Sequence, residues 1–133
     1  MIPESFRPLL ESQGFAVIST IEADGTPHSS AVYYLLDDDG KLKFSLNGAR
    51  RKVQNLLRTP KASVLFVDPE NPFRTLELRG DVTLDVDADF AFRSKVDAKY
   101  NMDASQYDKP GDTRYIITME PQRVREWPPP DGH

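Results

Sequence analysis

Residues 75–86 alternate apolar and polar side chains more regularly than any other part of the chain. The apolar members are Leu76, Leu78, Val82, Leu84 and Val86, and charged residues dominate the intervening positions. A period of two is typical of a strand that buries one face. Gly80 interrupts the apolar face in the middle of this strand. It predicts a bend or bulge of the kind that curls a sheet into a barrel.

Further strands are expected on both sides of this segment. They cover residues 15–21, 29–36, 41–46, 62–67 and 115–119. The turns between the first three contain Gly25 and Gly40, which predicts an antiparallel meander. The strand at 62–67 is almost continuously apolar, and this pattern predicts that both of its faces are covered.

Helices are expected at residues 3–13, directly after the Asn47-Gly48 turn, and over 87–100 with Asp87 as its N-cap. The segment 101–113 is polar and irregular, and the proline-rich tail 128–133 should run extended over the surface. Together these elements predict a single domain over residues 1–133. Its fold class is mainly β (α+β), with about six strands in a closed or partly closed antiparallel barrel and peripheral helices.

Three consecutive cations, Arg50, Arg51 and Lys52, follow the strand at 41–46. They would lie in the first turn of a helix, where the partial positive charge makes each cation unfavourable by roughly 0.3–1 kcal/mol. An anionic ligand, most simply a phosphate, would satisfy both the free amides and the cations. A solvated basic patch is the alternative.

Composition excludes several classes of function. The chain has 133 residues, a net charge of −4 and no cysteine. Nucleic acid is therefore not expected as a partner. With only His28 and His133 as histidines, no metal site or catalytic triad can be assembled. No apolar run approaches the roughly 20 residues that span a bilayer, and no signal peptide is visible. We expect a cytoplasmic protein without a membrane partner.

The chain resembles the pyridoxamine-phosphate-oxidase-like split β-barrel flavoproteins, and in particular their small actinobacterial branch that uses the deazaflavin coenzyme F420. The strongest segments are AVISTIEADGTPHSSAVYY, FSLNGARRKVQNLLRTPKASVLFVD, LRGDVTL and RYIITMEPQRVREW. A pattern S-x4-R-x-K-x2-N-L matches the family segment that holds the cofactor phosphate, and it is formed by Ser45, Arg50, Lys52, Asn55 and Leu56. The resemblance implies a six-stranded antiparallel split β-barrel. It also implies a homodimer with cofactor sites shared between the subunits.

The resemblance gives the basic cluster a role in binding the cofactor phosphate. Arg50 and Lys52 would hold the phosphate, with the Ser45 hydroxyl and the amides of residues 48–51 as further donors. Arg51 would lie beside them or point to solvent. Ser45 also has a purely structural interpretation as an outward-facing polar residue of its strand.

The resemblance places the cofactor ring along the strand from Pro27 to Val32, whose backbone would face the pyrimidine edge. Ser29 or Ser30 could add a hydroxyl group, and either could equally be a structural polar residue. Phe73 is where relatives place an aromatic side chain near the ring of the partner subunit's cofactor. Its alternative role is a loop hydrophobe that covers the dimer interface.

F420 and FMN make different demands on such a site. FMN ends in a dianionic phosphate, whereas F420 carries a phosphodiester followed by an acidic oligoglutamate tail. A site for F420 therefore needs cations at the phosphate and a basic exit for the tail. Lys41, Lys43 and Arg58 lie close to the cluster in sequence and are the candidates for that exit.

The expected chemistry is redox chemistry carried by a cofactor, because the chain offers no convincing acid–base pair or activated nucleophile. The leading interpretation is an F420-dependent oxidoreductase that transfers hydride from reduced deazaflavin to a small conjugated or heterocyclic acceptor. We predict no catalytic side chain. The alternatives are an F420 carrier without turnover and an FMN-binding oxidase or reductase, and haem is bound by other relatives on the same scaffold.

A homodimer is also expected from the apolar surface. The doubly apolar strand at 62–67 and two aromatic residues predicted to be exposed, Tyr33 and Tyr34, imply more apolar surface than one small barrel can cover.

Overall fold

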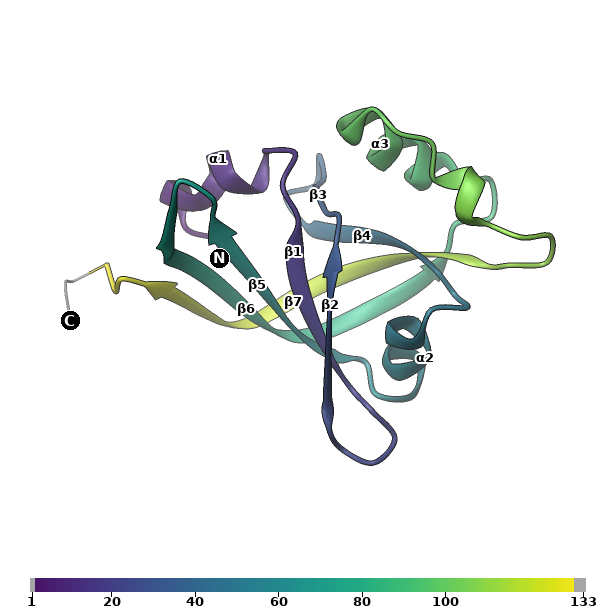
Figure 1. Cartoon of the computed structure of the whole chain (residues 1–133), viewed down its shortest axis with the longest axis horizontal. Coiled ribbons are helices and arrows are strands. Elements are labelled where there is room, and N and C mark those ends of the chain that lie inside the picture. Colours follow the sequence, from purple (N-terminus) through teal and green to yellow (C-terminus); the bar gives the residue numbers. More distant parts are fainter. Residues whose placement is uncertain (1, 131–133) are drawn as a thin grey trace.

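The computed structural model describes residues 2–130 as one curled antiparallel sheet surrounded by short helices (Figure 1). The strands are β1 (Ala16–Ile21), β2 (Pro27–Val32), β3 (Leu35–Leu36), β4 (Leu42–Asn47), β5 (Lys61–Asp68), β6 (Asn71–Val86) and β7 (Arg114–Trp127). The helical segments are η1 (Glu4–Phe6), α1 (Arg7–Leu10), α2 (Arg51–Arg58), α3 (Ala91–Tyr100) and η2 (Ala104–Tyr107). The strand order is β2-β1-β5-β6-β7-β4-β3. The predicted mainly-β split barrel is confirmed, with seven strands in place of six.

The barrel is split at the segment that was predicted to form one strand over residues 29–36. β2 pairs with β1, whereas β3 pairs with β4 at the opposite edge of the sheet. Between them, the Tyr33 ring stacks on Tyr100 with centroids 4.2 Å apart. Tyr34 is only 1% exposed and meets the edge of Phe66. The prediction that both tyrosines are exposed was therefore wrong for Tyr34, because this residue turns into the core as the chain changes partners.

The two longest strands, β6 and β7, cross the whole sheet (Figure 1). β7 continues to Trp127 instead of ending near residue 119, because Pro121 lies at an irregularity where the ladder shifts register between Arg79 and Gly80. A Cβ atom on Gly80 would lie 2.1 Å from the carbonyl oxygen of Glu120. The predicted irregularity at Gly80 is confirmed, and it lets two strands approach more closely than a side chain would allow.

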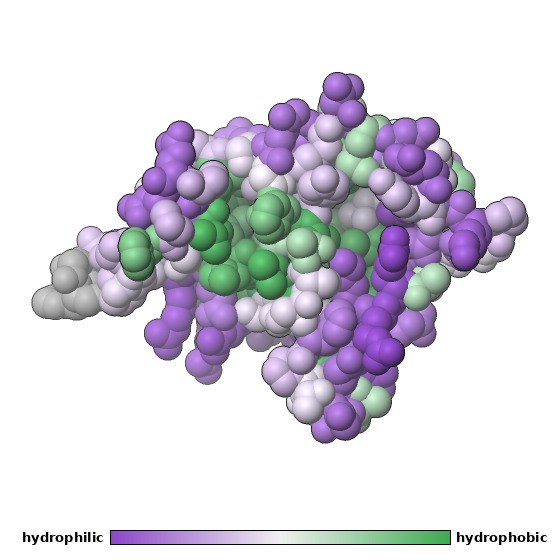
Figure 2. Space-filling model, in the orientation of Figure 1, coloured by the Kyte–Doolittle hydropathy of each residue, from purple (hydrophilic) through white to green (hydrophobic). Residues whose placement is uncertain are grey.

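β5 buries one face only within this chain. Ala62, Val64 and Phe66 are buried in the core, whereas Leu65 is half-buried and Val67 is 38% exposed. The expectation that both faces are covered is therefore not met by residues 2–130. Figure 2 shows an apolar area over β1 and β5 on this side of the molecule.

α2 is held against β1 by its buried face. Val53 and Leu56 are fully buried, while Leu57, also expected on this face, is 48% exposed. The buried Asn55 donates a hydrogen bond from its amide to the Thr20 hydroxyl at 3.0 Å. This bond fixes the rotation of the helix, and with it the direction in which the first turn presents its cations.

α3 begins at Ala91, four residues later than predicted, because Phe90 adopts a left-handed conformation with φ of 60°. Asp87 nevertheless caps the helix, since its carboxylate accepts from the amides of Phe92 at 3.2 Å and Arg93 at 2.8 Å. Phe92 and Val96 form the buried side. The helix lies over the β3–β4 side of the sheet (Figure 1).

The terminal segments are shorter than expected. In place of one helix over 3–13, η1 is followed by α1, which ends at Leu10, and Phe6 and Leu10 are buried. Residues 128–130 follow β7 outside any strand, and the rest of the predicted extended tail lies outside the described residues. Within residues 2–130, no helix is long and apolar enough to cross a membrane.

The C-terminal end of α3 is anchored to the segment around Tyr34 by a half-buried lysine. Lys99 donates to the Tyr34 carbonyl oxygen at 2.7 Å and lies 4.1 Å from the centroid of the Tyr34 ring. Tyr100 donates to the Gly14 carbonyl oxygen at 2.6 Å. Burial lowers the pKa of Lys99 to about 8.

We expect the free energy of unfolding to depend on pH through Lys99. The unfolded chain keeps this lysine protonated up to a pKa of about 10.4, so between roughly pH 8 and 10 it binds more protons than the folded chain, and stability rises with pH. The free energy of unfolding is measured in urea for wild type and for Lys99→Met. The wild-type value minus the variant value should increase by about 1 kcal/mol from pH 7.5 to 9.5, after allowance for partial exposure. A difference that stays flat or falls would contradict this assignment.

Candidate functional site

A cavity of about 270 Å³ opens at the split of the barrel, between the ends of β2 and β4 on one side and α3 with the following segment on the other. Four cationic side chains line it, and these are Arg50, Lys52, Arg93 and Arg114. Asp97 is the one carboxylate among the lining residues, and its oxygen already accepts from the Ala104 amide at 3.1 Å. The cavity is therefore suited to anions.

Asn47, the last residue of β4, fixes the turn that leads into α2. Its side-chain oxygen accepts from the Ala49 amide at 2.8 Å. Its amide group donates to Asp108 at 2.8 Å and to Asp112 at 2.9 Å. The segment before β7 thus holds the turn that presents the basic cluster.

The free amides at this turn are fewer than predicted. The Gly48 amide donates to the Thr113 carbonyl oxygen at 2.7 Å, the Ala49 amide to Asn47, and the Arg50 amide to the Asn47 carbonyl oxygen at 3.1 Å. Among residues 2–130, the amides of 51 and 52 have no acceptor. The backbone amides predicted as free donors were those of residues 48–51. In the structure the free amides are instead those of residues 51 and 52, the first two positions of α2.

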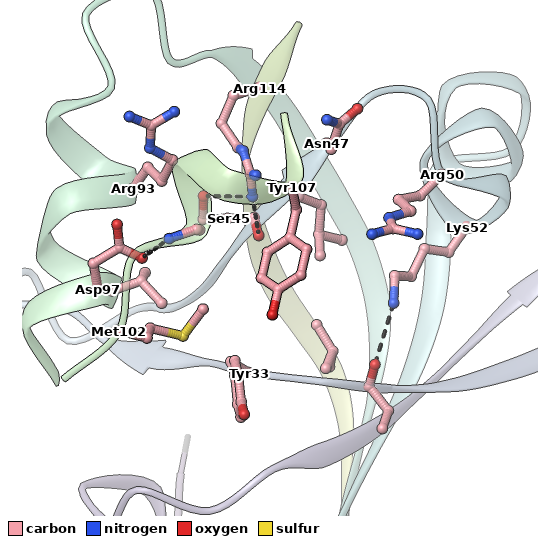
Figure 3. Close-up of a pocket in the computed structure, with 15 residues that line it drawn as sticks. Tyr33, Ser45, Asn47, Arg50, Lys52, Arg93, Asp97, Met102, Tyr107 and Arg114 are labelled. Carbon is pink, nitrogen blue, oxygen red and sulfur yellow. Dashed lines mark hydrogen bonds between the residues drawn. The ribbon is translucent and has the colours of Figure 1, made fainter. Parts of the chain in front are cut away.

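Lys52 and Arg50 lie together at one side of the cavity (Figure 3). The Lys52 ammonium donates to the Ser30 hydroxyl at 3.1 Å and to the Ala31 carbonyl oxygen at 3.2 Å. Burial, and then the neighbouring Arg50 cation, lower the pKa of Lys52. No carboxylate in the described part of the chain forms an ion pair with either residue. A bound anion would offset the cost of holding these cations together.

Arg114 and Ser45 lie at another side of the same cavity (Figure 3). Arg114 is only 7% exposed and forms an ion pair with Asp108, which also pairs with Arg93 at 2.9 Å. Burial acts in the opposite direction, but the bonds from Arg114, Asn47 and Arg93 hold the pKa of Asp108 below its usual range. Asp108 therefore stays ionised and keeps both arginines in place.

Of the strand predicted to line the ring, the structure brings the C-terminal half close to the basic cluster, because Lys52 donates to the Ser30 hydroxyl and the Ala31 carbonyl oxygen. Ser29 points to the opposite face of β2, where its hydroxyl lies 2.7 Å from the Ser19 hydroxyl. Pro27 begins β2 and lines a separate hollow with Ser19.

Two further predicted residues lie apart from the cavity. Arg51 is turned away and pairs with Glu22 at 3.2 Å. Phe73 is 78% exposed near the β5–β6 turn and does not line the cavity.

The three cations expected at the exit for an acidic tail bind other groups of the chain. Lys43 pairs with Asp37 at 2.9 Å and Lys41 with Glu120 at 3.4 Å. Arg58 donates to the Ile21 carbonyl oxygen at 2.9 Å. Each of these three cations therefore already has a partner within the chain, and the basic exit for an acidic tail stays a prediction.

One wall of the cavity is formed by the segment 101–113, which was predicted to be irregular and was not recognised as part of a site. Met102, Ala104 and Tyr107 come from this segment, and Arg93 comes from α3. Nothing in their spacing indicates a site. Arg114 did carry a signal, because a charged residue at the start of a buried strand requires a partner. Within residues 2–130, no group of three or more histidine or acidic side chains is arranged to hold a metal ion.

The fold and the cavity define a class of protein. The sequence profile of the pyridoxamine 5'-phosphate oxidase family matches residues 2–128, so the chain belongs to this family. A solved structure named as an F420 reductase is 31% identical, with a TM-score of 0.80, and the match covers 93% of this chain and 98% of that one. No curated protein matches the sequence.

More distant structures share the fold. A conserved hypothetical protein from Mycobacterium tuberculosis is 21% identical with a TM-score of 0.75, and the match covers 96% of this chain and 85% of that one. A heme binding protein from Mycobacterium smegmatis is 21% identical with a TM-score of 0.68, over 95% of this chain and 55% of that one. At these identities the likeness describes the fold alone.

Proposed function

We propose that this chain is an F420-dependent oxidoreductase that reduces a small conjugated or heterocyclic acceptor. The observation that carries the proposal is the Arg50–Lys52 pair at the open N-terminus of α2, in which Lys52 is partly desolvated and neither cation has a carboxylate partner within residues 2–130. These donors fit a phosphate or phosphodiester. The F420 reductase at 31% identity favours the deazaflavin over FMN.

β2 is suited to the flat ring of such a cofactor. It forms one edge of the sheet, so part of its backbone has no neighbouring strand. Ala31 and Tyr33, at the end of β2 and just beyond it, line the cavity that contains Lys52. A cofactor held by its phosphate at Lys52 could therefore extend its ring along this edge. Bound F420 would supply the hydride, and the chain would bind and orient it.

Acceptor-dependent oxidation separates a reductase from a carrier. Reduced F420 is mixed with the protein without oxygen, and its oxidation is followed after addition of quinones, activated enones or tetrapyrrole-like pigments. We expect faster oxidation with at least one acceptor than with free reduced F420, and loss of the effect in Lys52→Ala. Tight binding without acceptor-dependent oxidation across the panel would favour the carrier, and preferential binding of FMN would favour the flavin enzyme.

The proposal includes a homodimer with cofactor sites shared between the subunits. Support comes from an apolar surface that one chain leaves uncovered (Figure 2). It comprises Phe15, Val17, Tyr33, Leu65 and Val67, of which Phe15 is 63% and Tyr33 48% exposed. A contiguous apolar patch that adjoins the cavity at Tyr33 is typical of an interaction surface.

We expect light scattering at micromolar concentration to give twice the mass of the chain. Val67→Asp should shift the protein toward monomer, because it would bury a charge in the interface. Lys109→Asp, which changes an exposed residue away from the patch, is the control. A monomeric wild type, with and without F420, would contradict the dimer and the shared sites together.

A further inference from the structure

The side of the cavity that contains Arg114 has hydrogen-bond donors that the structure does not use fully. Arg114 directs Nε and Nη2 to Asp108, whereas its Nη1 makes only long contacts, 3.3 Å to the Ser45 carbonyl oxygen and 3.5 Å to the Ser45 hydroxyl. Figure 3 shows Tyr107 with its hydroxyl directed toward the middle of the cavity. Tyr107 is 58% exposed and its hydroxyl makes no hydrogen bond within residues 2–130, whereas the Nε atom of Arg93 is buried without a partner.

The charges are also incompletely balanced at this side. Arg93 and Arg114 share one carboxylate, that of Asp108, which leaves one positive charge for the three residues. Asp112 accepts from Asn47 and does not line the cavity, and Asp97, the one carboxylate that does, already accepts from the Ala104 amide. Because Arg114 is 7% exposed, water screens its charge poorly, and a single negative charge on a ligand would be favourable here.

The geometry of the donors selects the class of anion. Asp108 occupies one edge of the Arg114 guanidinium, so only Nη1 remains for a ligand oxygen. With the hydroxyls of Ser45 and Tyr107, this gives three donors and one net charge, which fits a carboxylate. A phosphate dianion is better matched by Arg50 and Lys52, together with the free amides of α2.

We propose that the residues Ser45, Tyr107 and Arg114 form a carboxylate subsite, separate from the phosphate position at Arg50 and Lys52. This inference rests on the proposed function, since it divides one cofactor cavity into two anion positions. It also changes the role of Ser45, which the sequence suggested as a phosphate ligand. The carboxylate would be carried either by the acidic tail of F420 or by the acceptor.

The test uses Ser45→Ala, Tyr107→Phe and the double variant, because these changes leave the Arg114–Asp108 ion pair in place. Ser94→Ala, at an exposed position of α3 that does not line the cavity, is the matched control. Thermal melts establish that each variant is folded. Titrations with F420 and with FMN then separate the two anion positions, because FMN carries a phosphate and no carboxylate.

If the carboxylate belongs to the cofactor, each single variant should weaken F420 binding by about tenfold and the double variant by more, with FMN binding unchanged. If it belongs to the acceptor, neither cofactor titration changes. A naphthoquinone with a propionate side chain should then bind the F420-loaded double variant at least tenfold more weakly, as measured by calorimetry. Its methyl ester should bind wild type and variant equally.

Two results would overturn the subsite. Equal losses for FMN and F420 would mean that one phosphate position extends over Ser45. Unchanged affinity for both cofactors and for the naphthoquinone propionate in the folded double variant would mean that these residues have a structural role only. Neither result affects the proposed function, which is tested separately by acceptor-dependent oxidation of reduced F420.

Discussion

Replacing Lys52 with alanine is expected to weaken F420 binding by about 1.5–3 kcal/mol, roughly 10- to 150-fold. The reason is that its ammonium group is partly desolvated beside Arg50 and has no carboxylate partner, so a bound phosphate would supply its missing counter-charge. Arg50→Ala should weaken binding by a similar amount. Both variants should keep their stability or gain slightly, because each removes a cation from a helix N-terminus.

Arg51→Ala is the matched control for these two variants. Its guanidinium pairs with Glu22 and points away from the cavity, so its removal should change F420 affinity much less, and chiefly at low salt. Fluorescence titration of F420 against wild type and the three variants measures all of these effects. Unchanged affinity in both Arg50→Ala and Lys52→Ala would show that the phosphate binds elsewhere.

Gly80→Ala is expected to destabilise the protein by about 3 kcal/mol or more. A Cβ atom at this position would lie 2.1 Å from the Glu120 carbonyl oxygen and 2.9 Å from the Gln122 amide nitrogen. Both are backbone atoms, so no side-chain rotation can relieve the clash. The two longest strands would have to separate at the point where the sheet curls.

Gly40→Ala provides the comparison for Gly80→Ala. Gly40 has a φ of 80° but open space where a Cβ would lie, so alanine there should cost only about 1 kcal/mol, from backbone strain. Urea unfolding of both variants gives the two free energies. If Gly80→Ala were as stable as Gly40→Ala, β6 and β7 would not approach closely at Gly80.

Local patterns predicted the elements that depend on neighbours in sequence. The alternation around Gly80 predicted both the longest strand and its irregularity, because side-chain period and glycine geometry are local properties. The cations at the start of α2 predicted an anion site for the same reason: they oppose the dipole of the helix that contains them. Asp87 was likewise recognised as a cap, although Phe90 moved the start of α3.

Contacts between distant segments could not be predicted in this way. Nothing local to Tyr33 and Tyr34 indicates that the chain crosses there from one edge of the sheet to the other. The partners of Asp108 lie 6, 15 and 61 positions away in sequence, and only the assembled barrel brings them together. Lys43, by contrast, pairs with Asp37 only six positions away, across the turn between β3 and β4.

The central claim, that this cavity binds F420, is tested most directly by competition among the cofactors that this fold accommodates. The protein is incubated with equimolar F420, FMN and haem and examined by native mass spectrometry. We expect F420 to be retained, in a ratio of one per chain on a dimer, and to be lost in the double variant Arg50→Ala/Lys52→Ala. Retention of FMN or haem in its place would contradict the assignment.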